Sequence, residues 1–331
     1  MELGCLFPPT AQTPEHIAVA EALGYERALV YDSPAFLADP WITLALAAAR
    51  TSRIRLGVAV ITPRLRHVVA TATALATLHA HAPGRVEAVI GSGFTAQLML
   101  GKKPVPWAEV ERYTVALRDL LAGRDIEWDA ALTGLKHGPR TGITPPGPGI
   151  PLYIAAHGPR GYGVAERAGD GIVTNLSHRG GNPPPPDMSR VQVLYYGTVL
   201  APGEDYGDER VLAAAGPYAA FQLHLGDLGV AGGTAESAAF AKALAEIDER
   251  RRHLELHRAH LIDLTELDRP HVTGELIART TGSGTAGQVR ARLSDIAAEG
   301  ARGVLYGPMG DDIPRELRAF ADAATAGRSF W

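Results

Sequence analysis

Cysteine is nearly absent from this chain, because Cys5 is the only one among 331 residues. An intramolecular disulfide and a cysteine-based metal cluster are therefore excluded. Since Cys5 lies in an apolar run, we expect it to be a small buried side chain. An excess of charge is also missing: the net charge is −4, and no dense block of lysine and arginine occurs. This balance gives no support for a nucleic-acid or membrane-surface partner.

Long apolar stretches are missing as well. No run reaches about 18 uncharged apolar residues, the length that a membrane-spanning helix needs. The N-terminus has no basic segment followed by the apolar core of a signal peptide. We therefore expect a soluble, cytoplasmic protein. The hydrophobic share of 46% and the charged share of 21% are ordinary for a globular protein and argue against long disorder.

One strand–helix–strand unit organises the rest of the chain. An apolar strand at Ile54–Ile61 stops at Pro63, and apolar residues at helical spacing follow over Val68–Leu78. A second apolar strand, Val86–Ile90, ends in Gly91-Ser92-Gly93. Both strands thus end in small or polar residues that suit a ligand site.

The alternation of strands and helices extends over the whole chain. We predict strands at Glu2–Phe7, Arg27–Tyr31, Ile54–Ile61, Val86–Ile90, Pro151–Ala156, Gly171–Thr174, Val191–Leu200 and Gly303–Tyr306. We predict helices over residues 13–24, 41–50, 68–78, 107–123, 160–168, 208–225, 234–260, 285–300 and 313–324, with caps at Thr13, Asp39 and Thr285. This pattern fits a (β/α)8 TIM barrel better than an open sheet with an appended domain, so we predict one domain over residues 1–331.

Two stretches are predicted to be irregular. Residues 125–151 lose periodicity and accumulate proline and glycine, which is typical of a connection over the surface. Residues 179–187 contain four consecutive prolines and are expected to form an extended rim loop after the sixth strand. That loop is a candidate lid or specificity loop, and a plain spacer is the alternative.

The chemistry of such a barrel lies at the C-terminal ends of its strands. Here these ends are rich in glycine, small hydroxyl and aromatic residues and poor in acids. They are Phe7-Pro8, Tyr31-Asp32-Ser33, residues 59–62, residues 91–94, residues 156–159, Thr174-Asn175, Tyr195-Tyr196-Gly197 and Tyr306-Gly307-Pro308. The lack of paired carboxylates and of histidines arranged with acids argues against two-acid glycoside hydrolysis and a metal-dependent hydrolase. The composition favours a large flat cofactor that carries its own chemistry.

Two glycine-containing turns have alternative interpretations. Residues 91–96 match the dinucleotide pattern G-x-G-x-x-A, with Glu109 or Glu111 as ribose acids. The match follows the fourth strand, whereas this fingerprint belongs after the first, so we do not favour it. Residues 157–160, His-Gly-Pro-Arg, join a strand to a helix whose free amides could bind a phosphate. An ordinary strand-to-helix turn is the alternative there.

Three histidines at helical spacing raise the question of a metal site. His253, His257 and His260 would share one face of the predicted helix over residues 234–260. They alternate with charged residues, however, which is typical of a solvated face. We therefore predict no metal.

A basic cluster follows the third strand. Arg64, Arg66 and His67 could hold an anionic cofactor tail or a substrate acid. Helix capping and surface charge explain the same residues equally well.

With these motifs in place, the chain resembles the bacterial luciferase-like superfamily, and within it the coenzyme F420-dependent oxidoreductases and methylenetetrahydromethanopterin reductase-like proteins. The resemblance rests on D-P-W-I-T-L-A-L-A-A-A-R-T-S-R-I-R-L-G-V-A-V-I-T-P-R-L-R-H (residues 39–67), G-R-V-E-A-V-I-G-S-G (84–93), P-L-Y-I-A-A-H-G-P (151–159), A-G-D-G (168–171) and G-T-A-G-Q-V-R-A-R-L (284–293). It covers most of the chain and is weakest over residues 179–280. It implies a (β/α)8 barrel independently of the strand pattern.

The resemblance also implies a set of cofactor-binding residues. Asp32 is similar to the residue beside the cofactor ring, and Ala59-Val60 to the family's non-prolyl cis peptide, which supports the ring from behind. Ser92 resembles the small hydroxyl under the cofactor. The remaining implied cofactor contacts are Thr62 at the end of the third strand, the phosphate loop Ala156, His157, Gly158 and Pro159, and the tail contacts Thr174 and Asn175.

The chain departs from the family at three positions. F420-dependent sugar-phosphate dehydrogenases have a histidine and a glutamate where this chain has Ser33 and Phe94. This difference argues against the sugar-phosphate reaction and leaves the acid–base roles open, with His157, Tyr196 and Asp32 as catalytic candidates. His157 also replaces a glycine that is frequent in the phosphate loop.

The resemblance implies an oxidoreductase that transfers a hydride between coenzyme F420 and an unsaturated or carbonyl small molecule. The close alternative is an FMN-dependent monooxygenase or reductase of the same family. An alternative of another class is a barrel without redox activity, which binds flavin, is purely structural, or works through His157 and Tyr196. Family members are often dimers, so a homodimer is one alternative, but the sequence identifies neither the oligomeric state nor the substrate.

Overall fold

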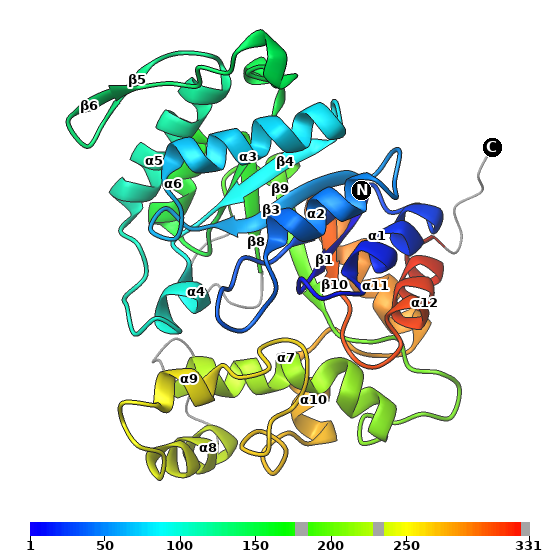
Figure 1. Cartoon of the computed structure of the whole chain (residues 1–331). Coiled ribbons are helices and arrows are strands. Elements are labelled where there is room, and N and C mark those ends of the chain that lie inside the picture. The colour runs from blue at the N-terminus through cyan, green and yellow to red at the C-terminus, as the bar shows by residue number, and fades with distance from the viewer. Residues whose placement is uncertain (176–184, 228–234, 326–331) are drawn as a thin grey trace.

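Eight parallel strands form the centre of the fold (Figure 1). The computed structural model describes residues 1–175, 185–227 and 235–325. The strands close into a barrel in the order β1-β10-β9-β8-β7-β4-β3-β2, which confirms the predicted (β/α)8 architecture. They are β1 (Glu2–Phe7), β2 (Arg27–Val30), β3 (Arg55–Ile61), β4 (Val86–Ile90), β7 (Leu152–Ala155), β8 (Gly171–Thr174), β9 (Val191–Tyr196) and β10 (Gly303–Gly307).

The seventh strand is shorter than its sequence pattern predicts. β9 ends at Tyr196 because Gly197, with a φ of 146°, turns the chain away from the barrel. Val199 then forms only an isolated parallel bridge with Gly284. The predicted end at Leu200 is therefore wrong.

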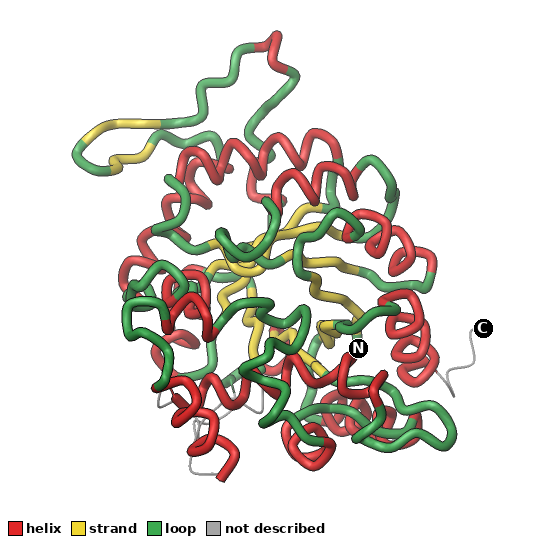
Figure 2. The backbone as a smooth tube through the Cα atoms, turned by 60° about the horizontal axis from the view of Figure 1, so that its bottom comes forward, coloured by secondary structure: helices red, strands yellow, loops and turns green. Residues whose placement is uncertain are grey.

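Helices surround the strands, as the backbone view in Figure 2 shows. They are α1 (Thr13–Ala22), α2 (Pro40–Ala48), α3 (Val68–His81), α5 (Trp107–Leu121), α6 (Pro159–Ala168), α11 (Ala286–Ala298) and α12 (Ile313–Thr325). Two predicted caps are confirmed: the Asp39 carboxylate accepts the amides of Trp41 and Ile42, and Thr285 forms a capping box with Gln288. The cap predicted at Thr13 is wrong, because its hydroxyl donates to the carbonyl of Pro8 instead.

A further helical layer follows β9 and lies against the end of the barrel where β9 ends (Figure 1, lower part). It consists of α7 (Glu209–Asp227), α8 (Ala235–Ala245), α9 (Arg252–Leu256) and α10 (Gly274–Thr280). The layer has its own apolar cluster, in which Ala219 and Leu223 of α7 pack with Phe240 of α8 and Ile277 of α10. The rim loop predicted after the sixth strand lies mostly outside the described residues.

The single long helix predicted over residues 234–260 is wrong. The chain turns between α8 and α9, where the Asp248 carboxylate accepts the amide of Arg250 at 2.9 Å. The guanidinium of Arg252 donates to the carbonyls of Ala245 and Ile247, also at 2.9 Å. These side chains satisfy backbone groups that a continuous helix would pair within itself. α9 ends at Leu256, so His257 lies beyond it.

The predicted surface connection over residues 125–151 contains an unpredicted hairpin. β5 (Ile126–Trp128) pairs antiparallel with β6 (Ala131–Thr133). Asp129 and Ala130 form the two-residue turn, with φ values of 50° and 63°. Such turns favour asparagine, aspartate or glycine at the first position and glycine at the second, so Ala130 at the second position removed the usual sequence signal. The hairpin projects beyond α5 at the upper left of Figure 1.

The barrel interior has a polar layer near the N-terminal ends of the strands. Arg27 is 1% exposed and pairs with Glu2 and with the buried Glu87. Glycines on neighbouring strands make room for these side chains: a Cβ on Gly4 would clash with the stem of Arg27. Apolar side chains fill the next part of the interior, among them Leu29 and Val89.

Two further expectations concern the cysteine and membrane-spanning helices. Cys5 is fully buried, as predicted, and lies in the core between the strands and the helices. Among the described residues, no helix is long and apolar enough to span a membrane.

Candidate functional site at the barrel mouth

The predicted cofactor residues occupy neighbouring strand ends. Because β2, β3, β4, β7 and β8 follow one another around the barrel, their C-terminal ends form one continuous arc. In that order, the arc carries Asp32, then Ala59, Val60 and Thr62, then Ser92, then residues 156–159, and finally Thr174 and Asn175. The fold thus brings together residues that are separated by more than 140 positions in the sequence.

The back of the arc is formed by β3 and its neighbours. The Ala59–Val60 peptide bond is cis, as the resemblance implied. The pairing register between β3 and β4 shifts between Ala59 and Ile61, so the strand bulges at this point. A Cβ built on Gly91 would lie only 3.3 Å from the side chains of Val60 and Ala155. Three adjacent strands therefore present a closely packed wall of small apolar groups.

Two buried polar side chains lie in the segments that follow β3 and β4. Thr62 is fully buried, and its hydroxyl has no hydrogen-bond partner among the described residues. It packs against Gly93, where a φ of +66° and the closeness of Thr62 exclude a larger residue. Gln97 in the short helix α4 (Phe94–Leu98) is also fully buried, and both atoms of its side-chain amide lack a described partner. Buried polar atoms without partners are rare in folded proteins, so Thr62 and Gln97 are candidates for contact with a bound molecule.

Asp32 has a carboxyl group suited to proton transfer near neutral pH. It is half-buried, and this burial raises its pKa to about 6. The Arg66 guanidinium opposes the rise, while the nearby Asp39 carboxylate adds to it. A carboxyl with such a pKa at a barrel mouth can both accept and release a proton under physiological conditions.

Tyr196 meets Tyr31 across one side of the mouth. Their hydroxyls lie 3.1 Å apart, although β2 and β9 are separated by β1 and β10 in the barrel. Tyr196 also stacks on Tyr218 of α7, with ring centroids 4.3 Å apart. Burial and the neighbouring Tyr31 hold the pKa of Tyr196 well above its usual value. Tyr196 is therefore a neutral hydrogen-bonding group and not a base.

His157 lies at the end of the arc with an exposed ring. Its Nδ1 accepts the backbone amide of Asn175 at 3.2 Å, and it lies 3.2 Å from the hydroxyl of Thr174. In a neutral ring this arrangement places the proton on Nε2. Gly158 is the N-cap of α6, so the first amides of that helix face the same region.

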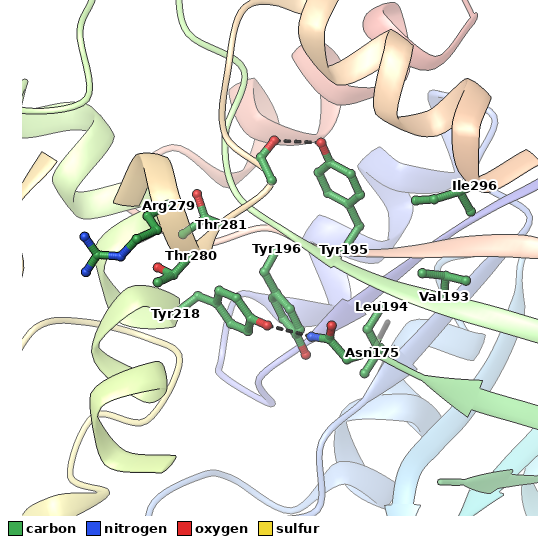
Figure 3. Close-up of a pocket in the computed structure, with 11 residues that line it drawn as sticks. Asn175, Val193, Leu194, Tyr195, Tyr196, Tyr218, Arg279, Thr280, Thr281 and Ile296 are labelled. Atoms are coloured by element: carbon green, nitrogen blue, oxygen red, sulfur yellow. Dashed lines mark hydrogen bonds between the residues drawn. The ribbon is translucent and has the colours of Figure 1, made fainter. Parts of the chain in front are cut away.

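A cavity of about 250 Å³ lies next to the arc, at the end of β9 (Figure 3). It lies between β9, α7 and the C-terminal end of α10 with the residues that follow it. Its lining residues are Asn175, Val193, Leu194, Tyr195, Tyr196, Tyr218, Arg279, Thr280, Thr281, Gly282 and Ile296. Pockets for drug-sized ligands have about 300–1,000 Å³, so this cavity fits a small molecule and not a whole flavin-like cofactor.

Asn175 is tied to this cavity by its side chain. Its Nδ2 donates to the hydroxyl of Tyr218 at 2.6 Å (Figure 3). Tyr218 was missed in the sequence because its place over the mouth depends on how α7 packs. Gln97 was missed too, although a glutamine beside the predicted glycine turn is a usable signal.

The basic cluster after β3 makes contacts typical of surface residues. Arg64 pairs with Glu109, with a shortest distance of 2.7 Å, and Arg66 pairs with Asp39 at 3.2 Å. The ring of His67 caps α3 by accepting the amide of Val69. Capping and surface pairing thus account for the cluster in this structure.

The two acids proposed for ribose binding are similarly engaged. Glu109 is held by Arg64, and Glu111 forms two hydrogen bonds of 2.7 Å with Arg167. These ion pairs link neighbouring parts of the protein surface. They give no support to the dinucleotide interpretation of residues 91–96.

Comparison with known proteins finds a family match over the part of the chain that contains the arc. The family described as luciferase-like monooxygenase matches residues 6–182, which is more than half of the 331 residues. An F420-dependent glucose-6-phosphate dehydrogenase from Beutenbergia cavernae is 35% identical over 178 residues, which cover 48% of this chain and 50% of that protein. A 5,10-methylenetetrahydromethanopterin reductase from Methanolobus tindarius is 26% identical over 177 residues, covering 51% and 52%. The chain thus spans about half the length of the curated relatives it matches.

Solved structures agree with the fold over nearly the full length. The coenzyme F420-dependent tetrahydromethanopterin reductase from Methanopyrus kandleri aligns with a TM-score of 0.69 and 20% identity, covering 97% of each chain. The FMN-bound oxygenating constituent of 3,6-diketocamphane monooxygenase from Pseudomonas putida aligns with a TM-score of 0.60 and 16% identity, covering 98% of this chain and 97% of that chain. At such identities the comparison supports the fold alone.

Proposed function

This protein belongs to the luciferase-like monooxygenase family, and from that premise we propose that it is an oxidoreductase that transfers a hydride between coenzyme F420 and an unsaturated or carbonyl small molecule. The observation that carries the proposal is the arc at the barrel mouth. Residues 6–182, which match the family, include every residue of the arc from Asp32 to Asn175. FMN is the alternative cofactor.

The arc offers suitable surfaces for a flat ring system. Val60 and Ala155 leave little room for a side chain at Gly91, and with glycine there a ring could approach the backbone closely. The hydroxyl of Thr62 has no partner among the described residues and would gain one from a polar ring edge. These features fit a deazaflavin or flavin better than a flexible polar ligand.

The end of the arc suits the anionic tail of such a cofactor. The helix α6 begins at Pro159, directly after its N-cap Gly158, and the backbone amides of Arg160 and Gly161 in its first turn have no partners within the helix. The His157 ring, fixed through its Nδ1 by the Asn175 amide, directs Nε2–H away from that contact. Together they would bind and orient a phosphate.

Asp32 is the residue we propose for proton transfer. When bound, the cofactor would supply the electrons and the hydride. The chain must then hold or deliver the accompanying proton, and the Asp32 carboxyl, with a pKa of about 6, is poised to do so. The Tyr31–Tyr196 pair would donate hydrogen bonds and exclude water on the β9 side, where the small cavity could receive the substrate.

The first test is a titration of the purified protein with oxidised and reduced F420 and, separately, with FMN, followed by absorbance and fluorescence. We expect saturable binding of F420. Saturable binding of FMN alone would replace F420 by the alternative cofactor, and binding of neither would favour a barrel without redox activity.

A substitution of Gly158 tests whether the phosphate of the cofactor binds at the start of α6. Gly158 has an extended φ of −165°, which any residue adopts, so Gly158→Val leaves the backbone unstrained. We expect it to weaken cofactor binding by about 10-fold or more, because a side chain would hold the phosphate away from the α6 amides. Gly163→Ala in the middle of α6 is the control and should leave the affinity unchanged. Equal affinity of both variants would contradict the assignment of the phosphate loop.

A further inference from the structure

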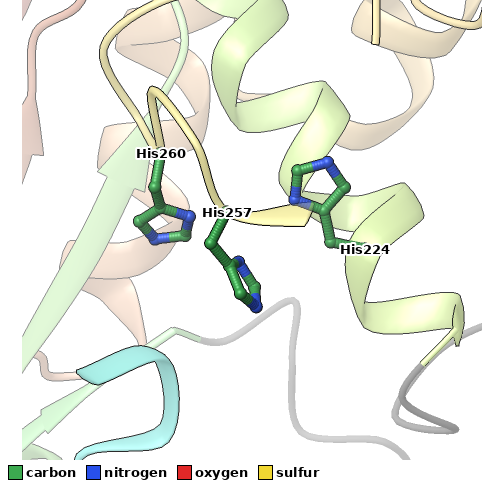
Figure 4. Close-up of side chains that lie close together, drawn as sticks. All are labelled: His224, His257 and His260. Atoms are coloured by element: carbon green, nitrogen blue, oxygen red, sulfur yellow. The ribbon is translucent and has the colours of Figure 1, made fainter. Parts of the chain in front are cut away.

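Three imidazoles meet in the helical layer outside the arc. His224 belongs to α7, while His257 and His260 lie in the segment that follows α9 (Figure 4). One ring nitrogen from each histidine lies within 4.8 Å of those of the other two. The rings of His224 and His257 are 5.7 Å apart, and those of His257 and His260 are 5.4 Å apart, in edge-to-face arrangements. Packing has thus gathered three potential ligands from two segments.

The ring orientation of His224 is fixed by a buried carboxylate. Its Nε2 lies 2.8 Å from an oxygen of Asp268, and both side chains are almost fully buried. Asp268 also accepts the amide and hydroxyl of Thr265. Because the Asp268 carboxylate accepts from Thr265 on one oxygen, its other oxygen is the acceptor that faces Nε2 of His224. Nε2 therefore carries the proton, and a lone pair remains on Nδ1 of His224.

That lone pair has no hydrogen donor in the part of the chain that the structure describes. The same holds for both ring nitrogens of His257, which is fully buried, and for Nδ1 of His260. His257 is fully buried, and a neutral imidazole in such surroundings has one lone pair on a ring nitrogen. One ion that accepts a lone pair from each ring would satisfy the three lone pairs of the cluster. A metal cation is such an acceptor.

We propose that His224, His257 and His260 form a binding site for one divalent transition-metal ion, with zinc as the ion best suited to it. Neutral imidazole nitrogens are preferred zinc ligands, and three of them leave a fourth position for water. The Asp268 carboxylate behind His224 is the usual support of a metal-binding histidine. Nitrogens on a tetrahedral zinc lie about 3.3 Å apart, given Zn–N bonds of about 2.0–2.1 Å. The rings must therefore draw together when the ion binds.

The site differs from the one that helical spacing suggested. His253 lies within α9, whereas His257 and His260 lie beyond its end, so the three do not share a helical face. His224, 33 positions before His257, takes the place of His253. The ion would connect α7 to the segment after α9 and stabilise their packing. This inference does not depend on the proposed cofactor.

The experiment is a titration of the metal-free full-length protein with Zn²⁺ and with Co²⁺. We expect one ion per chain, and a Co²⁺ visible spectrum of the intense, four-coordinate type. His257→Ala and His260→Ala should each weaken Zn²⁺ binding by about 100-fold, and Asp268→Asn by about 10–100-fold. His253→Ala is the matched control and should change the affinity by less than about 3-fold.

Several results would overturn the proposal. These are the absence of stoichiometric binding, a weak six-coordinate Co²⁺ spectrum, or a loss of affinity in His253→Ala equal to that in His257→Ala. Because His257 is buried, each variant is checked by circular dichroism, and His257→Gln serves as a second variant of similar size. The Co²⁺ spectrum of the unmodified protein tests the ligand set even if a variant fails to fold.

Discussion

At the scale of single residues, the environment of a side chain decides its chemistry more than its type does. Asp32 and Asp39 lie seven positions apart in the same loop region. Asp39 caps α2 at the surface, whereas burial raises the pKa of Asp32 to about 6. Only the second is suited to proton transfer near neutral pH.

The burial of Asp32 also leads to a prediction for the free energy of unfolding. Because the folded-state pKa of Asp32 lies above its unfolded value, the folded protein binds the proton more tightly, and stability falls as the pH rises from about 4 to about 6. Asp32→Asn should therefore stabilise the cofactor-free protein at pH 7 by about 1 kcal/mol, a value reduced from the full shift because the group is partly exposed. The gain should disappear near pH 4.

Denaturant unfolding at pH 4 and at pH 7 checks this expectation. Asp295→Asn on the exposed face of α11 is the control and should change stability by less than about 0.5 kcal/mol at both pH values. A gain for Asp32→Asn that is the same at both pH values would contradict the raised pKa.

At the scale of elements, α7 decides which residues face the barrel mouth. Tyr218 of α7 stacks on Tyr196 and accepts a hydrogen bond from Asn175, so one helical residue closes the cavity at the end of β9. The start of α7 is fixed by Arg210, which pairs with the buried Glu316 of α12 at 2.7 Å. The helix α7 is therefore attached to the barrel through Arg210 near its start and through Tyr218 further along.

Two substitutions of Tyr218 separate stacking from hydrogen bonding. Tyr218→Phe keeps the ring and should cost about 1 kcal/mol through the lost hydroxyl. Tyr218→Ala also removes the stack and should cost about 3–5 kcal/mol, because the residue is only 2% exposed. Thermal and denaturant unfolding measure both values. Equal losses would mean that the stack with Tyr196 contributes nothing.

At the scale of the whole molecule, the two ends of the barrel have different tasks. The C-terminal end carries the arc of cofactor candidates, and the N-terminal end carries the buried pairs of Arg27 with Glu2 and Glu87. In TIM barrels the first end supports function and the second supports stability.

This division predicts how Arg27→Met behaves. The substitution leaves Glu87 buried without its main partner, so we expect a loss of about 3–5 kcal/mol in the free energy of unfolding. Cofactor affinity should remain within about 2-fold, because the arc lies at the other end of the barrel. Adding Glu87→Gln should recover part of the stability.

An exposed ion pair provides the control for Arg27→Met. Arg167 pairs with Glu111 on the surface, and Arg167→Met should cost less than about 1 kcal/mol. Cofactor binding and unfolding are measured on the same samples. A large drop in affinity for Arg27→Met at a temperature where it is fully folded would contradict the separation of the two ends.

The sequence by itself determined the barrel and the arc. Apolar strands that alternate with capped helices leave few alternatives to a parallel barrel, and the order of the strands places their C-terminal ends side by side. Asp32, Ala59-Val60 and Ser92 lie at or just after the C-terminal ends of β2, β3 and β4, so the strand pattern placed them at the barrel mouth, while the family resemblance implied their roles toward a cofactor. The turn between β5 and β6 escaped prediction because Ala130 occupies the position where glycine is usual, and the break before α9 escaped it because side-chain contacts of Asp248 and Arg252 form the turn.

Only the tertiary structure decided what meets across the mouth and within the helical layer. The contact of Tyr31 with Tyr196 spans 165 positions, and His224 of α7 meets His257, which lies in the segment after α9. Periodicity reports which face of an element is buried, but it does not report which distant element covers that face. The histidine cluster and the cavity at β9 arise from such long-range packing, for which the sequence contains no local signal.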